Sequence, residues 1–171
     1  MINKKKNVSQ NQAFKIIKFN KIKHEKCLLQ LTTCDVEIKR FLNIKTGDNV
    51  VFREGCNDIN LVAMMDDDSI GGFLSANITN GGRAYINQIY VFRKWRNRGI
   101  ANALLAEAEY LIKINWFVSG IYALTVENLS MDNILIDHGY LYHGSYNNFI
   151  YHNGKYLTQS LFVKPINSKT T

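Results

Sequence analysis

The sequence predicts a single domain of the α/β or α+β class. Three observations lead to this prediction: two early strands joined by a tight turn, a strand–helix–strand segment in the middle, and a hairpin near the end. The central crossing is expected to be right-handed. The chain has 171 residues, of which 46% are hydrophobic, and a chain of this size can bury one core without disulfides or a metal.

The first half of the chain is predicted to contribute mainly strands. Apolar runs bounded by turn residues indicate strands, whereas DVEIKRFLNI shows helical spacing after a cap at Thr33 or Asp35. The predicted elements are a strand at 14–19, the helix at 35–44, and strands at 59–65 and 71–79 that are joined by the turn 66–69.

The second half is predicted to alternate strands and helices. The turn Gly81-Gly82 precedes a strand, and the next helix repeats its apolar residues every three or four positions. Asn153-Gly154 is a strong hairpin signal. The predicted elements are strands at 84–92, 120–126 and 140–144, helices at 99–114 and 130–138, and two strands, FIYH and KYLTQSLFV, on either side of Asn153-Gly154.

The positive charge of the chain is concentrated at its N-terminus. The net charge is +7, and residues 1–26 hold eight lysines and one acidic residue, whereas the other 145 residues hold 13 Lys/Arg and 13 Asp/Glu. Such charge runs are usually solvated, although this one could contact RNA or another acidic partner. We expect a flexible basic arm at 1–12, one domain at 13–166 and a tail at 167–171.

Cysteine use and hydropathy predict a cytoplasmic protein with no membrane partner. No apolar run reaches the roughly 18–20 residues of a membrane span, and the N-terminus lacks the apolar middle of a signal peptide. Cys27, Cys34 and Cys56 are odd in number and lack CxxC spacing, which indicates reduced thiols. The aspartates of the turn 66–69 point in different directions, so we expect no metal.

Residues 91–109 (VFRKWRNRGIANALLAEAE) place four cations directly before the first turn of the central helix. The N–H groups at a helix N-terminus have no partner within the helix, and the positive potential there favours anions. Gly99 lets a ligand approach the main chain. The cations precede the helix rather than follow one face of it, which disfavours a nucleic-acid interface. The pattern therefore predicts a phosphate or pyrophosphate site.

The stretch 96–101 reads R-x-x-G-x-A and follows a strand that ends Ile89-Tyr90-Val91. It resembles the acetyl-CoA-binding signature of the GCN5-related N-acetyltransferases, the GNAT superfamily. The segments SIGGFLSANI and VENLSMDNILIDHGYLYHG also resemble that family, so that order and spacing agree over residues 59–164. The resemblance implies a mixed, mostly antiparallel sheet flanked by helices, in which a splayed strand pair holds the cofactor.

The same resemblance assigns cofactor contacts to individual residues. The main chain of the signature strand would pair with the pantetheine arm, and the N–H of Val91 would polarise the acetyl carbonyl. Main-chain N–H groups at the start of the helix would bind the pyrophosphate. The cofactor-binding residues implied in this way are Ile89, Tyr90, Val91, Arg96, Arg98, Gly99, Ile100, Ala101, Asn102 and Asn128.

The catalytic residues follow the family pattern less closely. Relatives often carry a general-acid Tyr seven residues after the Asn, where this chain has Leu135. Tyr140, Ser130 or solvent could supply the acid instead. Glu127 is the candidate base, and its alternative is a water relay lined by Asn87, Gln88 and Tyr85.

The function implied is transfer of the acetyl group of acetyl-CoA to a primary amine of a small molecule or a protein, with no metal. Two alternatives remain open: a toxin-type enzyme that acts on aminoacyl-tRNA, and a catalytically inactive acyl-CoA-binding regulatory module. The sequence does not decide the acceptor, and it leaves a homodimer open.

Overall fold

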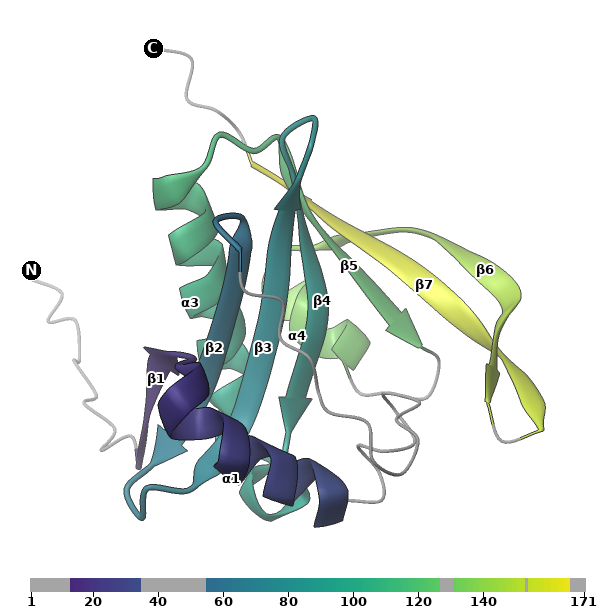
Figure 1. Cartoon of the computed structure of the whole chain (residues 1–171). Coiled ribbons are helices and arrows are strands. Elements are labelled where there is room, and N and C mark those ends of the chain that lie inside the picture. Colours follow the sequence, from purple (N-terminus) through teal and green to yellow (C-terminus); the bar gives the residue numbers. More distant parts are fainter. Residues whose placement is uncertain (1–12, 35–54, 127–130, 153, 167–171) are drawn as a thin grey trace, which may run out of the picture.

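The computed structural model of the chain describes residues 13–34, 55–126, 131–152 and 154–166 (Figure 1). The predicted helix at 35–44, the arm at 1–12 and the tail at 167–171 lie outside these residues. No helix among the described residues has both the length and the hydropathy needed to cross a membrane.

The described residues form one seven-stranded sheet with helices on both faces. Its order is β1-β2-β3-β4-β5-β7-β6, and every neighbouring pair is antiparallel except β4 and β5. The strands are β1 (Phe14–Lys18), β2 (Asp58–Met65), β3 (Ile70–Thr79), β4 (Arg83–Val91), β5 (Gly120–Val126), β6 (Leu141–His152) and β7 (Lys155–Pro165). The helices are α1 (Lys21–Cys34), α3 (Ile100–Asn115), α4 (Met131–Asp137) and the short 3-10 helix η1 (Arg93–Trp95).

Most predicted elements within the described residues are confirmed to within one residue, and the predicted hairpin is confirmed by the antiparallel pairing of β6 with β7, which reaches His152 and Lys155. The prediction of two separate strands at 140–144 and FIYH was wrong, because β6 runs continuously from Leu141 to His152. Register shifts between Tyr142 and Gly144 and between Tyr146 and Ile150 interrupt its alternation. The first shift adds one residue to β6 and so moves the following side chains to the other face, and the second adds two residues, which interrupts the regular pairing with β7.

Helix α1 was not predicted from the sequence. Its lysines obscure the helical period, but its start has a local cap: Asn20 Oδ1 accepts a hydrogen bond from the N–H of Lys23 (3.0 Å). In return, the N–H of Asn20 donates to His24 Nδ1 (2.9 Å). This reciprocal pair satisfies two main-chain donors, as a capping box does. Burial, followed by the nearby Lys23 charge, lowers the pKa of His24 and favours the neutral acceptor form.

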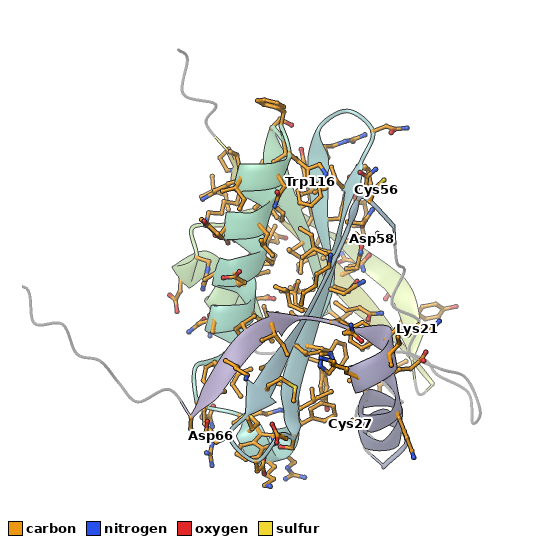
Figure 2. All side chains as sticks on the ribbon, turned by 60° about the vertical axis from the view of Figure 1, so that its left-hand side comes forward. Lys21, Cys27, Cys56, Asp58, Asp66 and Trp116 are labelled. Atoms are coloured by element: carbon orange, nitrogen blue, oxygen red, sulfur yellow. The ribbon has the colours of Figure 1, made fainter. Side chains whose placement is uncertain are left out.

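Two apolar layers hold the helices against the sheet. On one face, α3 packs its buried residues, among them Leu104, Leu105 and Ile112, against β2, β3, β4 and β5, and side chains fill the space between helix and sheet in Figure 2. On the other face, Leu28 of α1 lies in a cluster with Phe73 and Tyr90. The sheet is therefore covered on both sides near β3 and β4, which fixes the strand that carries the predicted site.

The two described free cysteines lie far apart. Cys27 is half-buried on α1, whereas Cys56 is exposed near the start of β2 (Figure 2). Cys34 belongs to α1, and its side chain lies outside the described atoms.

Candidate active site

The site begins where β4 and β5 separate. These parallel strands pair only from Arg83–Gly120 to Ile86–Ala123, although both continue beyond that point, and Figure 1 shows them diverging. Asn87 is an extra residue on β4, because Ile86 pairs with Ala76 and Gln88 with Ser75. A β-bulge bends a strand and increases its local twist. The bulge thus lies at the residue where β4 leaves β5.

A cavity of about 820 Å³ occupies the gap between the two strands. Its walls come from β4, the loop after β4, the first turn of α3, the end of β5, α4 and one residue of β7. The lining residues include Asn87, Gln88, Ile89, Tyr90, Val91, Arg96, Gly99, Ile100, Ala101, Asn102, Thr125, Leu135 and Gln159.

The main chain of β4 presents hydrogen-bonding groups to this gap. The N–H of Phe92 donates to the carbonyl of Gly71 on β3 (3.0 Å). Because successive residues of a strand direct their main-chain groups to opposite sides, the groups of Val91 and Ile89 face β5. No β5 residue pairs with either of them. The gap therefore offers one open strand edge to a ligand.

The start of α3 adds three main-chain donors at the mouth of the cavity. Gly99 caps the helix with φ 77° and ψ 5°, and within the described residues no side-chain cap hydrogen bond is made at this end. The first intrahelical hydrogen bond runs from the N–H of Ala103 to the carbonyl of Gly99 (3.0 Å). The N–H groups of Ile100, Ala101 and Asn102 consequently have no partner within the helix. A Cβ added at Gly99 would meet no heavy atom within 4 Å, so the space above the glycine is open.

The cations of the loop have separate roles. Arg96 Nε donates to the carbonyl of Val91 (3.1 Å), and its Nη2 lies 3.3 Å from the hydroxyl of Tyr90. The Arg96 side chain therefore joins the loop to the end of β4. Lys94 and Arg98 lie over the ring of Trp95, at 4.4 and 4.9 Å from its centroid. Arg98 is exposed and does not line the cavity.

The structure thus brings together most of the predicted cofactor residues. Ile89, Tyr90, Val91, Arg96, Gly99, Ile100, Ala101 and Asn102 line the same cavity. Asn128, the candidate base Glu127 and the alternative acid Ser130 lie outside the described residues. Tyr85, Asn87 and Gln88, the predicted water relay, also line the cavity.

Tyr140 is not among the residues that line the cavity. It is 2% exposed and lies in a cluster with Glu109 of α3 and Lys164 of β7. Lys164 Nζ lies 2.5 Å from Glu109 Oε2 and 5.5 Å from the centroid of the Tyr140 ring, and His138 Nδ1 lies 3.5 Å from Glu109 Oε1. Burial, followed by the charge of Glu109, raises the pKa of Tyr140 far above its usual range. Position and pKa both make Tyr140 a poor general acid.

We expect Tyr140→Phe to keep kcat within about threefold of the wild type, because the hydroxyl lies outside the cavity and holds its proton strongly. The stability of the wild type, measured against pH, tests whether the Tyr140 hydroxyl keeps its proton in the folded protein. The folded protein keeps the Tyr140 proton while the unfolded chain releases it near a pKa of about 10. The contribution of Tyr140 to the free energy of unfolding is therefore fully present below about pH 10, and it is lost as the pH rises further. A loss of kcat of about 100-fold or more in Tyr140→Phe would restore the acid role.

Several lining residues were not predicted. Thr125 of β5, Met131 and Ile134 of α4, and Gln159 of β7 meet at the cavity although they are far apart in sequence. In the sequence, Thr125 is one β-branched residue in an apolar strand, and such residues usually indicate packing alone. Thr125 lines a cavity only because β5 separates from β4.

Metal-ligand chemistry finds no support in the described part of the chain. The structure there contains no group of three or more His, Cys, Asp or Glu residues able to hold an ion. In the turn 66–69, Asp67 Oδ1 instead accepts hydrogen bonds from the N–H and the hydroxyl of Ser69. These two bonds lower the pKa of Asp67.

The parallel strands β4 and β5 separate beside the N-terminus of α3. One cavity therefore contains both an open strand edge and the main-chain donors of a helix start, and this combination defines the class of protein. The model of the Acetyltransferase (GNAT) family matches residues 32–129. This match covers more than half of the chain, and the protein belongs to the GNAT acetyltransferase family. The match begins before residue 59, where the sequence resemblance begins, and ends at 129, before α4, β6 and β7. No curated protein matches the chain.

Solved structures agree with this fold. Arabidopsis thaliana NAA60 in complex with acetyl-CoA has a TM-score of 0.66 at 21% identity, over 90% of this chain and 99% of that one. A GNAT-family acetyltransferase from Streptococcus pneumoniae has a TM-score of 0.71 at 18% identity, over 90% and 99%. A ribosomal-protein-alanine N-acetyltransferase from Brucella melitensis has a TM-score of 0.68 at 16% identity, over 89% and 99%. At these sequence identities the comparison shows that the folds are alike, and it shows nothing more.

Proposed function

We propose that this protein transfers the acetyl group of acetyl-CoA to a primary amine of a small molecule or a protein. The observation that carries the proposal is the continuity of one cavity, which joins the open edge of β4 to the N-terminus of α3 at Gly99. An elongated ligand with an anionic end and an amide-bearing arm matches these two features. Membership of the GNAT family supports acetyl transfer as the chemistry.

The residues present fit acetyl-CoA. The N–H groups of Ile100, Ala101 and Asn102 would bind the pyrophosphate, and the open space above Gly99 leaves room for its oxygens. The main-chain groups of Ile89 and the N–H of Val91 would pair with the amide-bearing arm as a neighbouring strand does, whereas the Val91 carbonyl already accepts from Arg96. When bound, acetyl-CoA supplies a thioester that a neutral amine can attack.

Residues of this chain must also stabilise the developing negative charge and accept the proton of the amine. A main-chain N–H of β4 would stabilise the charge that develops on the acetyl oxygen, and one such donor contributes about 3 kcal/mol in comparable sites. The N–H groups of Ile89 and Val91 both face the gap, and Ile89 is two residues closer to the point where the strands separate. Both are therefore candidate donors. The amine must also lose a proton, because a free amine of pKa about 10 is mostly charged at neutral pH. Glu127, or water held by Asn87, Gln88 and Tyr85, would accept it.

Binding and turnover test the proposal separately. Calorimetry should detect acetyl-CoA and CoA binding to the full chain, and a thiol-release assay should detect turnover on a panel of small amines and peptides with free N-termini. Mass spectrometry of the acetylated product then identifies the acceptor class. No binding of acetyl-CoA would overturn the proposal. Tight binding without turnover on any amine would favour the inactive acyl-CoA-binding module.

A further inference from the structure

The wall of the cavity formed by β5 and α4 is apolar except for one side chain. Its described residues are Ala123, Leu124, Thr125, Val126, Met131, Ile134 and Leu135. Ala123 and Thr125 are both buried and, being two apart on a strand, point to the face covered by α4. Thr125 therefore places the only hydroxyl within this described wall.

The Thr125 hydroxyl has no hydrogen-bond partner among the described residues. The residue is 4% exposed, and its Oγ1 bonds to no described protein atom. A buried polar group without a partner is unfavourable, and valine would fill the same volume without that cost. Thr125 also lines the cavity, so its side chain borders the space that a ligand would occupy on entering the gap between the strands.

The strand register places Thr125 at the depth where a ligand would end. Thr125 lies two residues beyond Ala123, the last β5 residue paired with β4. Ile89 lies three residues beyond Ile86, the last β4 residue paired with β5, and one of those three is the bulge residue Asn87. Thr125 and Ile89 therefore stand at the same level on opposite sides of the gap.

We propose that the Thr125 hydroxyl donates a hydrogen bond to the sulfur of the leaving thiol. This inference rests on the proposed function, and it assigns a partner to the sulfur in a chain that has Leu135 at the position of the usual family Tyr. The amine nitrogen forms a bond to the acetyl carbon, the C–S bond breaks, and its electron pair stays on sulfur. The hydroxyl stabilises that charge without giving up its proton, and the thiolate takes a proton from water.

The charged groups around this position are few. Arg96 is the only charged side chain among the described lining residues, and it donates to the carbonyl of Val91. Glu127 follows β5 directly in the sequence and lies outside the described residues. A hydrogen bond from Thr125 is therefore separable by mutation from both charges.

Thr125→Val tests the proposal, because it removes the hydroxyl and keeps the shape. We expect kcat to fall by about 10- to 100-fold, the range for a hydrogen bond to a charged group. Thr125→Ser should recover most of this loss. The melting temperature of Thr125→Val should equal or exceed that of the wild type, since the hydroxyl bonds to no protein atom in the part of the chain that the structure describes.

A second measurement does not depend on turnover. The ultraviolet absorbance of thiolate, followed against pH in the CoA complex, should show that Thr125→Val raises the pKa of the bound thiol by about 1 or more. The affinity for dethio-CoA, in which hydrogen replaces the thiol, should be unchanged between wild type and variant. This ligand separates contact with sulfur from contact with the rest of the arm.

The outcomes are distinct from failure of the proposed function. If the wild type bound and turned over acetyl-CoA while Thr125→Val kept its kcat and thiol pKa, the role of Thr125 would be overturned and the enzyme assignment would stand. An equal loss of affinity for CoA and dethio-CoA would instead assign the hydroxyl to an amide of the pantetheine arm, which also overturns the sulfur contact. Absence of acetyl-CoA binding by the wild type would overturn both.

Discussion

Gly99→Glu is expected to weaken acetyl-CoA binding by at least about 100-fold, or about 2.7 kcal/mol. The new carboxylate would stand beside the N–H groups of Ile100, Ala101 and Asn102, where it would repel the pyrophosphate and compete for the same donors. The fold should persist because a Cβ at Gly99 meets no neighbour. The positive φ of 77° costs a non-glycine residue about 1–2 kcal/mol, which a domain of ordinary stability tolerates. Calorimetry measures the affinity, and circular dichroism measures the fold.

Gly99→Gln is the matched control. Glutamine adds the same bulk and the same backbone strain as glutamate without the charge, so the difference in affinity between the two variants isolates the anion site. We expect Gly99→Gln to lose about tenfold or less. Unchanged affinity in Gly99→Glu would remove the helix N-terminus from the cofactor site.

Lys164→Met is expected to lower the free energy of unfolding by about 3 kcal/mol. The side chain of Glu109 is 8% exposed, and Lys164 Nζ lies 2.5 Å from its Oε2. Removing the cation leaves a buried carboxylate without its charged partner, which usually costs 3–5 kcal/mol. We take the low end because the Lys164 side chain is 20% exposed and the pair is partly solvated. Urea denaturation followed by circular dichroism measures the change.

The reverse substitution should be milder. In Glu109→Gln the Lys164 ammonium can move toward water on its flexible stem, so we expect a loss of about 1–2 kcal/mol. Lys113→Met, which removes an exposed lysine of α3, should change stability by no more than about 0.5 kcal/mol. Equal losses in Lys164→Met and Lys113→Met would show that the ion pair does not contribute to stability.

This pair has a structural consequence for the C-terminal part of the chain. Lys164 belongs to β7 and Glu109 to α3, so the contact fastens the final hairpin to the central helix. Tyr140, at the start of that hairpin, packs against the same pair. Tyr140, which the sequence suggested as a general acid, thus packs within the cluster that joins the hairpin to α3.

The strand–loop–helix at the centre of the site could be predicted from the sequence because it is local. The apolar period of α3, the cations before it and Gly99 all lie within about twenty consecutive residues. A helix N-terminus creates its own anion site wherever the chain around it folds. For the same reason, the residues of this segment that were predicted to bind the cofactor line one cavity, apart from Arg98, whose guanidinium stacks on Trp95.

The remaining parts depended on distant contacts. Helix α1 has too many lysines for a clear apolar period, and β6 hides its alternation behind two register shifts. The exclusion of Tyr140 from the cavity follows from its packing against Glu109 and Lys164, which lie 31 and 24 residues away in sequence. No local pattern records such a contact.

The sequence by itself determined the class of fold, the order of strands and helices around the site, and the main-chain cradle at Gly99, because these follow from period, turn residues and helix ends. Tertiary structure decided which side chains face the space between β4 and β5. That space exists because β4 bulges at Asn87 and leaves β5 after Ile86. Through this separation Thr125, an ordinary strand residue in the sequence, becomes a buried hydroxyl at the wall of the cavity.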